Sequence, residues 1–252
     1  LVNIVLDVVF IAVLGWGVAG AAIATVASQV ASALLTLRCV AGSEGMPWHL
    51  ALDKMRLNAK ILGAVCTIGI PAAAQSAMYN VSNMIIQSCM NSFGTDTIAA
   101  WGVYGKIDFV FWMTINSLGI AITTFVGQNF GARQYDRVKQ GVRVCMGMAA
   151  GLTLLVSVSF YLGAEPLFRV FTQDNSVVAV GVQMMHVLTP VYLTYISIEV
   201  LSGALRGCGD VRVPTLITVF FVCGLRVLWL TTMVPLYHTI ATVEFSYPLT
   251  WT

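Results

Sequence analysis

Long apolar runs separated by short polar stretches divide this sequence into segments of membrane-spanning length. A helix needs about 20 mostly apolar residues to cross a bilayer. Runs of that kind predict full spans at 18–40, 61–91, 97–127, 144–164, 177–205 and 213–236. The apolar stretches at 1–14 and from about 241 each predict part of a further helix, and Gly15-Trp16-Gly17 predicts a tight turn after the first of them.

The composition supports an all-α polytopic membrane helix bundle. Of the 252 residues, 58% are hydrophobic and only 10% are charged, and the mean hydropathy is +0.85. Soluble domains carry roughly 25% charged residues. This deficit excludes a soluble enzyme, a disordered chain and a disulfide scaffold, and makes the lipid bilayer the expected surroundings. The net charge of +2 gives no reason to expect a nucleic-acid partner.

The basic residues predict which loops face the cytoplasm. Loops that carry an excess of lysine and arginine stay inside. Four, four and two of the 13 lysines and arginines fall in or beside the stretches 42–60, 128–143 and 206–212. They are Arg38, Lys54, Arg56 and Lys60; Arg133, Arg137, Lys139 and Arg143; and Arg206 and Arg212. We therefore expect these loops to be cytoplasmic, and Gly15–Gly17, 92–96, 165–176 and 237–241 to face out.

The cysteines, the prolines and the two ends of the chain add detail to the predicted helix bundle but no candidate functional site. Six cysteines occur without metal-ligand spacing, which predicts free thiols. Pro71 and Pro190 lie within spans and predict bends. The chain opens on Leu1 and closes on Thr252 inside apolar sequence, so we expect a fragment of a longer membrane protein.

Asn3 and Asp7 form the first candidate site. They are four residues apart and therefore share one helix face. An amide oxygen and a carboxylate are hard ligands, suited to Na⁺ or to proton exchange. Thr25 lies at a matching depth on the next helix and offers a third ligand. The alternative is that Asn3 and Asp7 only cap or solvate a helix end.

Four further charges fall inside predicted spans, where ionisable groups usually face the bundle interior. They are Lys106, Asp108, Glu199 and Arg226, and their charges sum to zero. We expect an intramembrane charge network. Glu199 and Arg226 differ by roughly 9 Å of helix rise, which long side chains bridge if the helices tilt. This pair is either a structural ion pair or a gate or proton relay.

A polar helix face and an aromatic cluster predict a substrate cavity. Polar residues recur every three to four positions in 61–91, among them Gln75, Asn80, Asn83 and Gln87. Such a face should line a wet cavity rather than lipid. Tyr104 and Trp112, in the span 97–127, would add a surface for an aromatic or cationic molecule. The alternative for these aromatic residues is interfacial anchoring or packing.

No catalytic constellation is found in the sequence. The histidines His49, His186 and His238 are scattered, and no Ser-His-Asp, HExxH, P-loop or dinucleotide pattern occurs. We expect neither an enzyme nor a cofactor, and transport would have to draw on an ion gradient.

Several motifs together resemble the multidrug and toxin extrusion (MATE) family. Asn3-Ile4-Val5-Leu6-Asp7 and the stretch from Gly15-Trp16-Gly17 to Thr25 resemble its helices 5 and 6. Gly127-Gln128-Asn129-Phe130-Gly131-Ala132 resembles the loop after helix 8. Leu205-Arg206-Gly207-Cys208-Gly209-Asp210, with Pro214, resembles the loop between helices 10 and 11. The order of the motifs is collinear with that of the family.

The resemblance implies a two-lobed fold of twelve helices around a central cavity. On that map the chain runs from helix 5 to early helix 12: 1–41 is a remnant of the N-lobe, 42–60 a cytoplasmic loop between lobes, and 61–252 most of the C-lobe. Such proteins export drugs and other organic, often cationic, small molecules from the inner (plasma) membrane in exchange for Na⁺ or H⁺. We expect a monomer.

The same resemblance supports Asn3, Asp7 and Thr25 as a cation site. The DinF-like branch of the family uses an asparagine and an aspartate four apart on helix 5, a threonine on helix 6 and an aspartate on helix 1. The NorM-like branch instead has acids on helices 7 and 10, where this chain has Gln75 and Tyr195. The chain therefore resembles the DinF-like branch more closely.

Three rival functions stay open on the sequence. A lipid-linked precursor flippase of the same superfamily would need a strongly basic cavity, and the four charges above cancel. A membrane-embedded enzyme would need clustered catalytic residues on facing helices. A channel is less compatible with the proline-broken spans and the two-lobed resemblance than a carrier.

Overall fold

A computed structural model describes residues 1–43, 45–46 and 58–251, and this part of the chain is helical with no strand. Within these residues, six helical segments are long and apolar enough to cross a membrane: Gly17–Ala41, Ala59–Asn91, Thr95–Gly131, Tyr135–Leu162, Asn175–Gly207 and Arg212–Leu236. The predicted all-α membrane bundle and its six full spans are therefore confirmed.

The chain divides into two compact units, residues 1–62 and 63–252. The assignment of 1–41, 42–60 and 61–252 to a partial N-lobe, a loop and a C-lobe stays a prediction. His49, Lys54 and Arg56, which the sequence places in the loop, lie outside the described residues.

The first unit is a helical hairpin. Helix α1 (Val2–Asp7) continues directly as the π-helix η1 (Val8–Val13), and α2 (Gly17–Ala41) returns after the turn. Gly15 and Gly17 have φ of 67° and 52°, in the left-handed region that glycine adopts without steric cost. The rings of Phe10 and Trp16 stack with their centroids 5.2 Å apart. The predicted tight turn is thus present.

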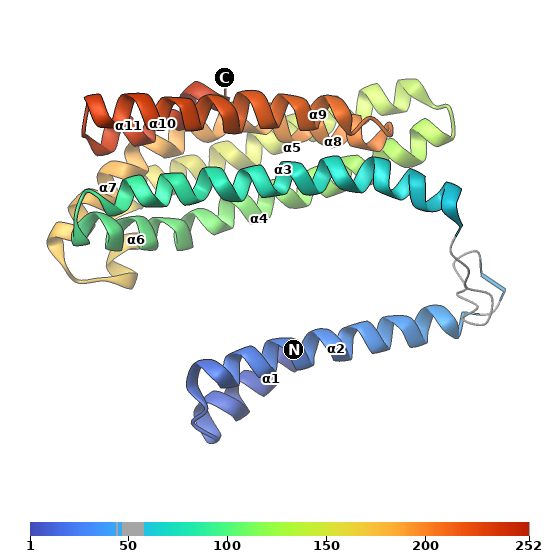
Figure 1. Ribbon diagram of the computed structural model, residues 1–252, viewed down its shortest axis with the longest axis horizontal. Helices are drawn as coiled ribbons and strands as arrows, with labels where there is room; N and C mark the ends of the chain where they lie inside the picture. The colour runs from blue at the N-terminus through green and yellow to red at the C-terminus, as the bar shows by residue number, and fades with distance from the viewer. Residues whose placement is uncertain (44, 47–57, 252) are drawn as a thin grey trace. The chain divides into compact units, whose positions relative to one another are not determined.

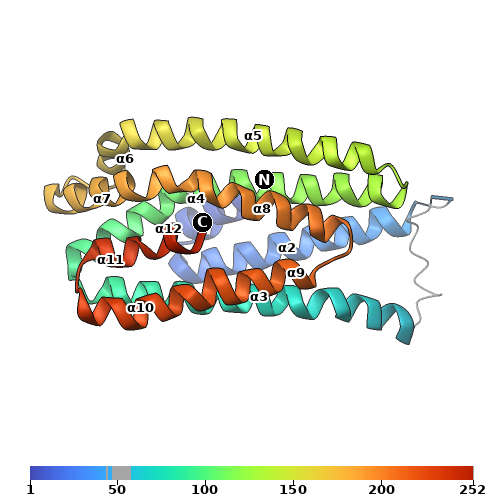
Figure 2. The same ribbon diagram turned by 90° about the horizontal axis from the view of Figure 1, so that it is seen from above.

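Three long helices follow: α3 (Ala59–Asn91), which lies in the second unit from Gly63 on, α4 (Thr95–Gly131) and α5 (Tyr135–Leu162). Helix α4 packs against α5, α7 (Asn175–Leu188) and α8 (Tyr192–Gly207), and Figure 2 shows α4 and α8 running alongside α5. The core among these helices includes Phe111, Ile115, Met184, Met185 and Leu188. Helix α3 contributes its C-terminal half, where Ser82, Ile86 and Met90 are buried.

Small residues set the separation of α4 and α8. A Cβ atom added to Gly203 would lie 2.9 Å from the carbonyl oxygen of Gly119 and 2.8 Å from Cγ2 of Ile122. Thr123 reinforces the contact by donating a hydrogen bond to the carbonyl oxygen of Gly203, at 3.0 Å. The two backbones therefore approach in the way that small residues allow in membrane bundles.

Two predicted spans contain irregular turns. The 3₁₀-helix η3 (Thr189–Val191), at Pro190, joins α7 to α8, which agrees with the predicted bend. The span after α8 consists of α9 (Arg212–Ile217), the π-helix η4 (Thr218–Gly224) and α10 (Leu225–Leu236). The chain continues through α11 (Ile240–Glu244) and α12 (Ser246–Trp251). All six cysteines are free, as predicted.

One helix was absent from the prediction. The stretch 165–176 was expected to be an external loop, but α6 (Ala164–Phe171) occupies its first half. Ala164 and Phe168 are buried, and α6 packs against α7. An eight-residue amphipathic helix is too short to register as a membrane span, which is why the apolar-run criterion missed it.

Basic residues gather at one end of the second unit. The beginning of α3, the α4–α5 turn and the α8–α9 turn lie at that end, whereas the α3–α4 turn, α6 and the α10–α11 turn lie at the other (Figure 1). The basic end carries the cluster from Arg133 to Arg143, Arg206 and Arg212. The arrangement of the spans thus agrees with the asymmetry seen in the sequence.

Candidate functional site

The residues of the predicted cation site lie on the two helices of the first unit, where Asn3 and Asp7 are partly buried and Thr25 is exposed. Asn3 and Asp7 are on α1, and Thr25 is on α2, which packs against it. The Thr25 hydroxyl donates to the carbonyl oxygen of Ala21, at 2.9 Å. The Asp7 carboxylate has one oxygen, Oδ1, that is buried and has no hydrogen-bond partner.

That unpartnered oxygen is chemically significant. A buried carboxylate oxygen without a donor carries a desolvation cost. A proton or a hard cation would relieve this cost, and the carboxylate, amide and hydroxyl groups of the three residues are oxygen donors of the kind such cations prefer. The fit to Na⁺ or H⁺ therefore rests on the donor set and on the orphaned oxygen.

The backbone is also unusual beside Asp7. The π-helix η1 begins at Val8, the next residue. Isolated π turns inside helices are uncommon and often lie at functional sites. The sequence contains no proline here, and its apolar residues give no sign of the change in helix type.

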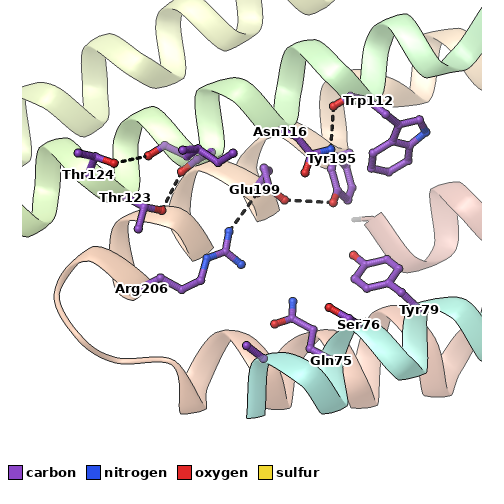
Figure 3. Close-up of a pocket in the computed structure, with 13 residues that line it drawn as sticks. Gln75, Ser76, Tyr79, Trp112, Asn116, Thr123, Thr124, Tyr195, Glu199 and Arg206 are labelled. Atoms are coloured by element: carbon purple, nitrogen blue, oxygen red, sulfur yellow. Dashed lines mark hydrogen bonds and ion pairs between the residues drawn. The ribbon is translucent and has the colours of Figure 1, made fainter. Parts of the chain in front are cut away.

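The second unit contains an open polar cavity of about 530 Å³ between α3, α4 and α8. Figure 3 shows side chains from these three helices pointing into it. The polar and aromatic residues that line it are Gln75, Ser76 and Tyr79 of α3; Trp112, Asn116, Thr123 and Thr124 of α4; and Tyr195, Glu199 and Arg206 of α8. We call it the polar cavity.

Glu199 is the carboxylate of the polar cavity. Its Oε1 accepts a hydrogen bond from Nη2 of Arg206 at 3.0 Å, and its Oε2 accepts one from the Tyr195 hydroxyl at 3.2 Å. A Cβ atom on Gly119 would collide with Oε1, so the carboxylate rests directly on the backbone of α4. Gln75, on the opposite wall, donates to Oγ1 of Thr218 at 3.0 Å.

A second cavity of about 400 Å³ is largely aromatic. The aromatic residues that line it are Tyr79, Trp101, Tyr104, Trp112, Tyr247 and Trp251, and Asn83, Gln87, Asp108 and Arg226 add polar groups. We call it the aromatic cavity. It shares Tyr79 and Trp112 with the polar cavity.

Neutral donors hold the Asp108 carboxylate in place. Nε1 of Trp112 donates to one oxygen and the Tyr192 hydroxyl donates to the other, both at 2.6 Å. The Tyr192 hydroxyl lies 3.0 Å from that of Tyr104, and its ring stacks on Phe111 with centroids 4.0 Å apart. Asp108 therefore needs no cation to satisfy both oxygens.

Arg226 is among the most deeply buried side chains in the described residues, at 2% exposed. Its Nη2 donates to Oγ1 of Thr250 at 2.7 Å. Its guanidinium carbon lies 4.5 Å from the ring centroid of Tyr247 and 5.7 Å from that of Trp251. Aromatic faces thus take the place of an acidic partner.

The predicted network of four charges is wrong in its pairing. Within the described part of the chain, Glu199 pairs with Arg206 rather than Arg226. Lys106 is exposed, with its Nζ 5.6 Å from the ring centroid of Phe171. Helix rise gives the depth of a residue but not which helices are neighbours, so the depth argument chose the wrong partner for Glu199.

The predicted cavity residues divide between the two cavities. Gln75 lines the polar cavity, Asn83, Gln87 and Tyr104 line the aromatic one, and Trp112 lines both. Asn80 lines neither of them: it is exposed and donates to the carbonyl oxygen of Ser76 at 2.9 Å. The prediction that Asn80 lines a cavity was wrong because polar spacing along the helix does not show which polar residues face the cavity.

Sequence reasoning missed three notable residues. Arg206 lies seven positions after Glu199, a spacing that returns to the same helix face, so this partner was detectable. Tyr79 sits within the polar face of α3, but its place in both cavities depends on the packing. Glu244, at 1% exposed with an unpartnered Oε1, follows an apolar run and had no pattern to mark it.

Comparison with known proteins places these features in a family context. The family model MatE matches residues 71–230. The probable multidrug resistance protein YoeA of Bacillus subtilis is 26% identical over 216 residues, which cover 84% of this chain and 46% of that protein. The probable multidrug resistance protein NorM of Thermotoga maritima is 22% identical, over 80% of this chain and 43% of that protein. The chain spans about half the length of the curated relatives it matches.

Solved structures show the same fold. A MOP superfamily transporter from Pyrococcus furiosus matches with a TM-score of 0.89 at 20% identity, over 99% of this chain and 56% of that one. A mutant of the MATE transporter VcmN from Vibrio cholerae matches with a TM-score of 0.85 at 20% identity, also over 99% of this chain and 56% of that one.

Proposed function

This chain belongs to the MatE family, and on that premise we propose that its protein is a cation-coupled antiporter that exports organic, often cationic, small molecules by alternating access. The two roles fall to different units. Asn3, Asp7 and Thr25 in the first unit bind the coupling ion, Na⁺ or H⁺. The polar and aromatic cavities of the second unit receive the substrate.

The buried, unpartnered Oδ1 of Asp7 carries the proposal for the ion site. In a membrane such an oxygen is costly unless a partner arrives. An ion that binds one conformation better than another shifts the population between them. In this proposal an ion or a proton supplies the partner that Oδ1 of Asp7 lacks among the described residues.

Aromatic surfaces and a carboxylate support the proposal for an organic cation. Tyr79 and Trp112 line both cavities, and Glu199 carries a negative charge in the polar one. Cations are attracted to the faces of such rings. Each cavity has one acid and one base, Glu199 with Arg206 and Asp108 with Arg226, so neither has the strongly basic lining that a pyrophosphate-carrying flippase needs.

We further propose that the protein acts as a monomer in the plasma membrane, with the basic end of the second unit in the cytoplasm. The distribution of lysine and arginine supports this orientation. The substrate then enters the polar cavity from the side where Arg206 lies.

A vesicle assay tests the ion site. The protein, expressed at its full natural length, is reconstituted with ethidium, and efflux is driven by an imposed Na⁺ or H⁺ gradient. Asp7→Asn should reduce gradient-driven efflux to the protein-free level while ethidium binding in detergent persists. Asp96→Asn, at an exposed acid in the first turn of α4, is the matched control and should transport normally. Normal coupled efflux by Asp7→Asn would refute the assignment.

A further inference from the structure

A groove in the second unit runs between α4 and α5. It has a volume of about 360 Å³ and is distinct from both cavities described above. Leu118, Ala121, Ile122 and Phe125 line it from α4, at spacings of three and four residues that place them on one face. Val144, Cys145 and Met148 line it from α5 in the same way.

The groove is lined mainly by apolar residues, and Gln140 and Arg137 of α5 are its polar lining residues. Its only charged lining residue within the described part of the chain is Arg137, two residues after the beginning of α5. Arg137 also lines a second hollow of about 500 Å³ at the α4–α5 turn. The two hollows therefore meet at one guanidinium group.

The hollow at the turn favours an anion. Arg133, Arg137 and Lys139 line it together with a single acid, Asp136. Neither ion pair found in the described residues, Glu165–Arg169 or Glu199–Arg206, involves these cations. The first turn of α5 adds backbone N–H groups, because the side chain of Gln134 does not cap them, and helix N-termini favour phosphate.

The combination of an apolar groove and a cationic end matches one class of ligand. A phospholipid has an apolar chain joined to a phosphate, so it can contact both the groove and the cations. Free phosphate cannot fill the apolar groove, and a lipid without a phosphate cannot pair with the cations. We propose that the α4–α5 groove binds an acyl chain of an anionic phospholipid, with the phosphate at Arg137 and at the α4–α5 turn. This site is separate from the proposed transport sites, so it does not depend on them.

The side chains at the turn fit this role. Arg137 is exposed, and its Nη1 donates to Oε1 of Gln134 at 3.0 Å, so a phosphate meets a guanidinium that is already oriented. Arg133 has a φ of 58°, a left-handed conformation that favours glycine. Further along the groove, a Cβ atom on Gly141 would collide with the Phe125 ring. Helices α4 and α5 are therefore closely packed at the floor of the groove, beneath the proposed acyl chain.

Native mass spectrometry tests the proposal on the protein expressed at its full natural length. The protein is titrated in detergent with palmitoyl-oleoyl phosphatidylglycerol, with phosphatidylcholine of the same chains and with inorganic phosphate. We expect phosphatidylglycerol to be retained preferentially. Arg137→Gln should weaken it about fivefold, the ratio that corresponds to the attraction of one basic residue for an anionic lipid.

Two variants separate the groove from simple surface charge. Ala121→Trp fills the groove and leaves every cation in place, and it should also weaken phosphatidylglycerol. Met113→Trp, at an exposed position of α4 outside the groove, and Arg143→Gln, on α5 but outside both hollows, are the matched controls. They should bind phosphatidylglycerol as the unmodified protein does.

Three results would overturn the proposal. The first is equal retention of phosphatidylcholine and phosphatidylglycerol. The second is undiminished binding by Ala121→Trp, which would mean that only surface charge attracts the lipid. The third is displacement of phosphatidylglycerol by inorganic phosphate at equal concentration, which would mean that the acyl chain adds nothing. Thermal unfolding of each variant confirms that any loss of lipid is not a loss of fold.

Discussion

Arg206 closes over Glu199 from one face of the same helix, with its Nη2 3.0 Å from Oε1. Because the two residues are seven positions apart, the backbone of Arg206 lies two turns nearer the basic end, and its side chain reaches back to the carboxylate. The Tyr195 hydroxyl bonds the other oxygen. The acidic group of the polar cavity is thus already engaged by a cation that belongs to the chain.

Removing Arg206 should make Glu199 more available to an organic cation. For Arg206→Ala we expect ethidium to bind the detergent-solubilised protein about fivefold more tightly, since a partly exposed ion pair contributes up to about 1 kcal/mol. Fluorescence titration measures the affinity. Arg206→Lys keeps the charge and should change it little. Unchanged or weaker binding by Arg206→Ala would show that Arg206 does not compete for the carboxylate.

Gly203 should be essential to the contact between α4 and α8. Gly203→Ala places a methyl group 2.9 Å from the Gly119 carbonyl oxygen, so the helices must separate, at a cost of about 1–3 kcal/mol. Thermal unfolding in detergent should show a lower midpoint. Gly151→Ala on α5 meets nothing within 4 Å, and it should raise the midpoint slightly because alanine favours helix. The opposite ranking of the two variants would contradict this packing.

Asp174 should make stability depend on pH at the beginning of α7, outside the membrane-spanning segments. Its Oδ1 accepts hydrogen bonds from the backbone N–H of Ser176 at 2.9 Å and from the Ser176 hydroxyl at 2.7 Å. These bonds to the charged form lower the pKa of Asp174 below its ordinary value of 3.8. The stabilisation is therefore complete above the ordinary value and is lost as the pH falls through the lowered one.

Comparison of two variants checks this dependence. Asp174→Ala removes the N-cap, so its unfolding midpoint should lie below that of the unmodified protein at neutral pH, and the gap should shrink at acidic pH. Asp174→Asn keeps an acceptor but does not titrate, so its gap relative to Asp174→Ala should stay constant. A gap between the unmodified protein and Asp174→Ala that widens with acid would contradict the sign.

The sequence predicted the spans well because a membrane helix is defined by the length of its apolar run. It did not predict where those runs change helix type. The residues of η4, Thr218–Gly224, are as apolar as their neighbours, so composition carries no trace of the π turn. Likewise, α6 is held by the burial of Phe168 in the core, and this burial depends on helix packing that the sequence pattern does not show.

The sequence indicated which types of residue line the candidate sites, but not which side chains pair with one another. Spacing alone placed Asn3 with Asp7, and polarity alone placed Gln75 and Gln87 at cavities. The neutral donors of Asp108 come from Trp112, one turn away, and from Tyr192, 84 positions further along the chain. Such long-range contacts arise from helix packing, which the linear pattern does not encode.

The π-helix that follows Asp7 sets the direction in which the helix face before it points. An α-helix advances about 100° and 1.5 Å with each residue, and a π turn holds one residue more than an α turn. If Val8–Val13 returned to α geometry, everything before it would swivel by that angle about the helix axis. The face that carries Asn3 and Asp7 would then point in another direction relative to the tight turn at Gly15 and Gly17.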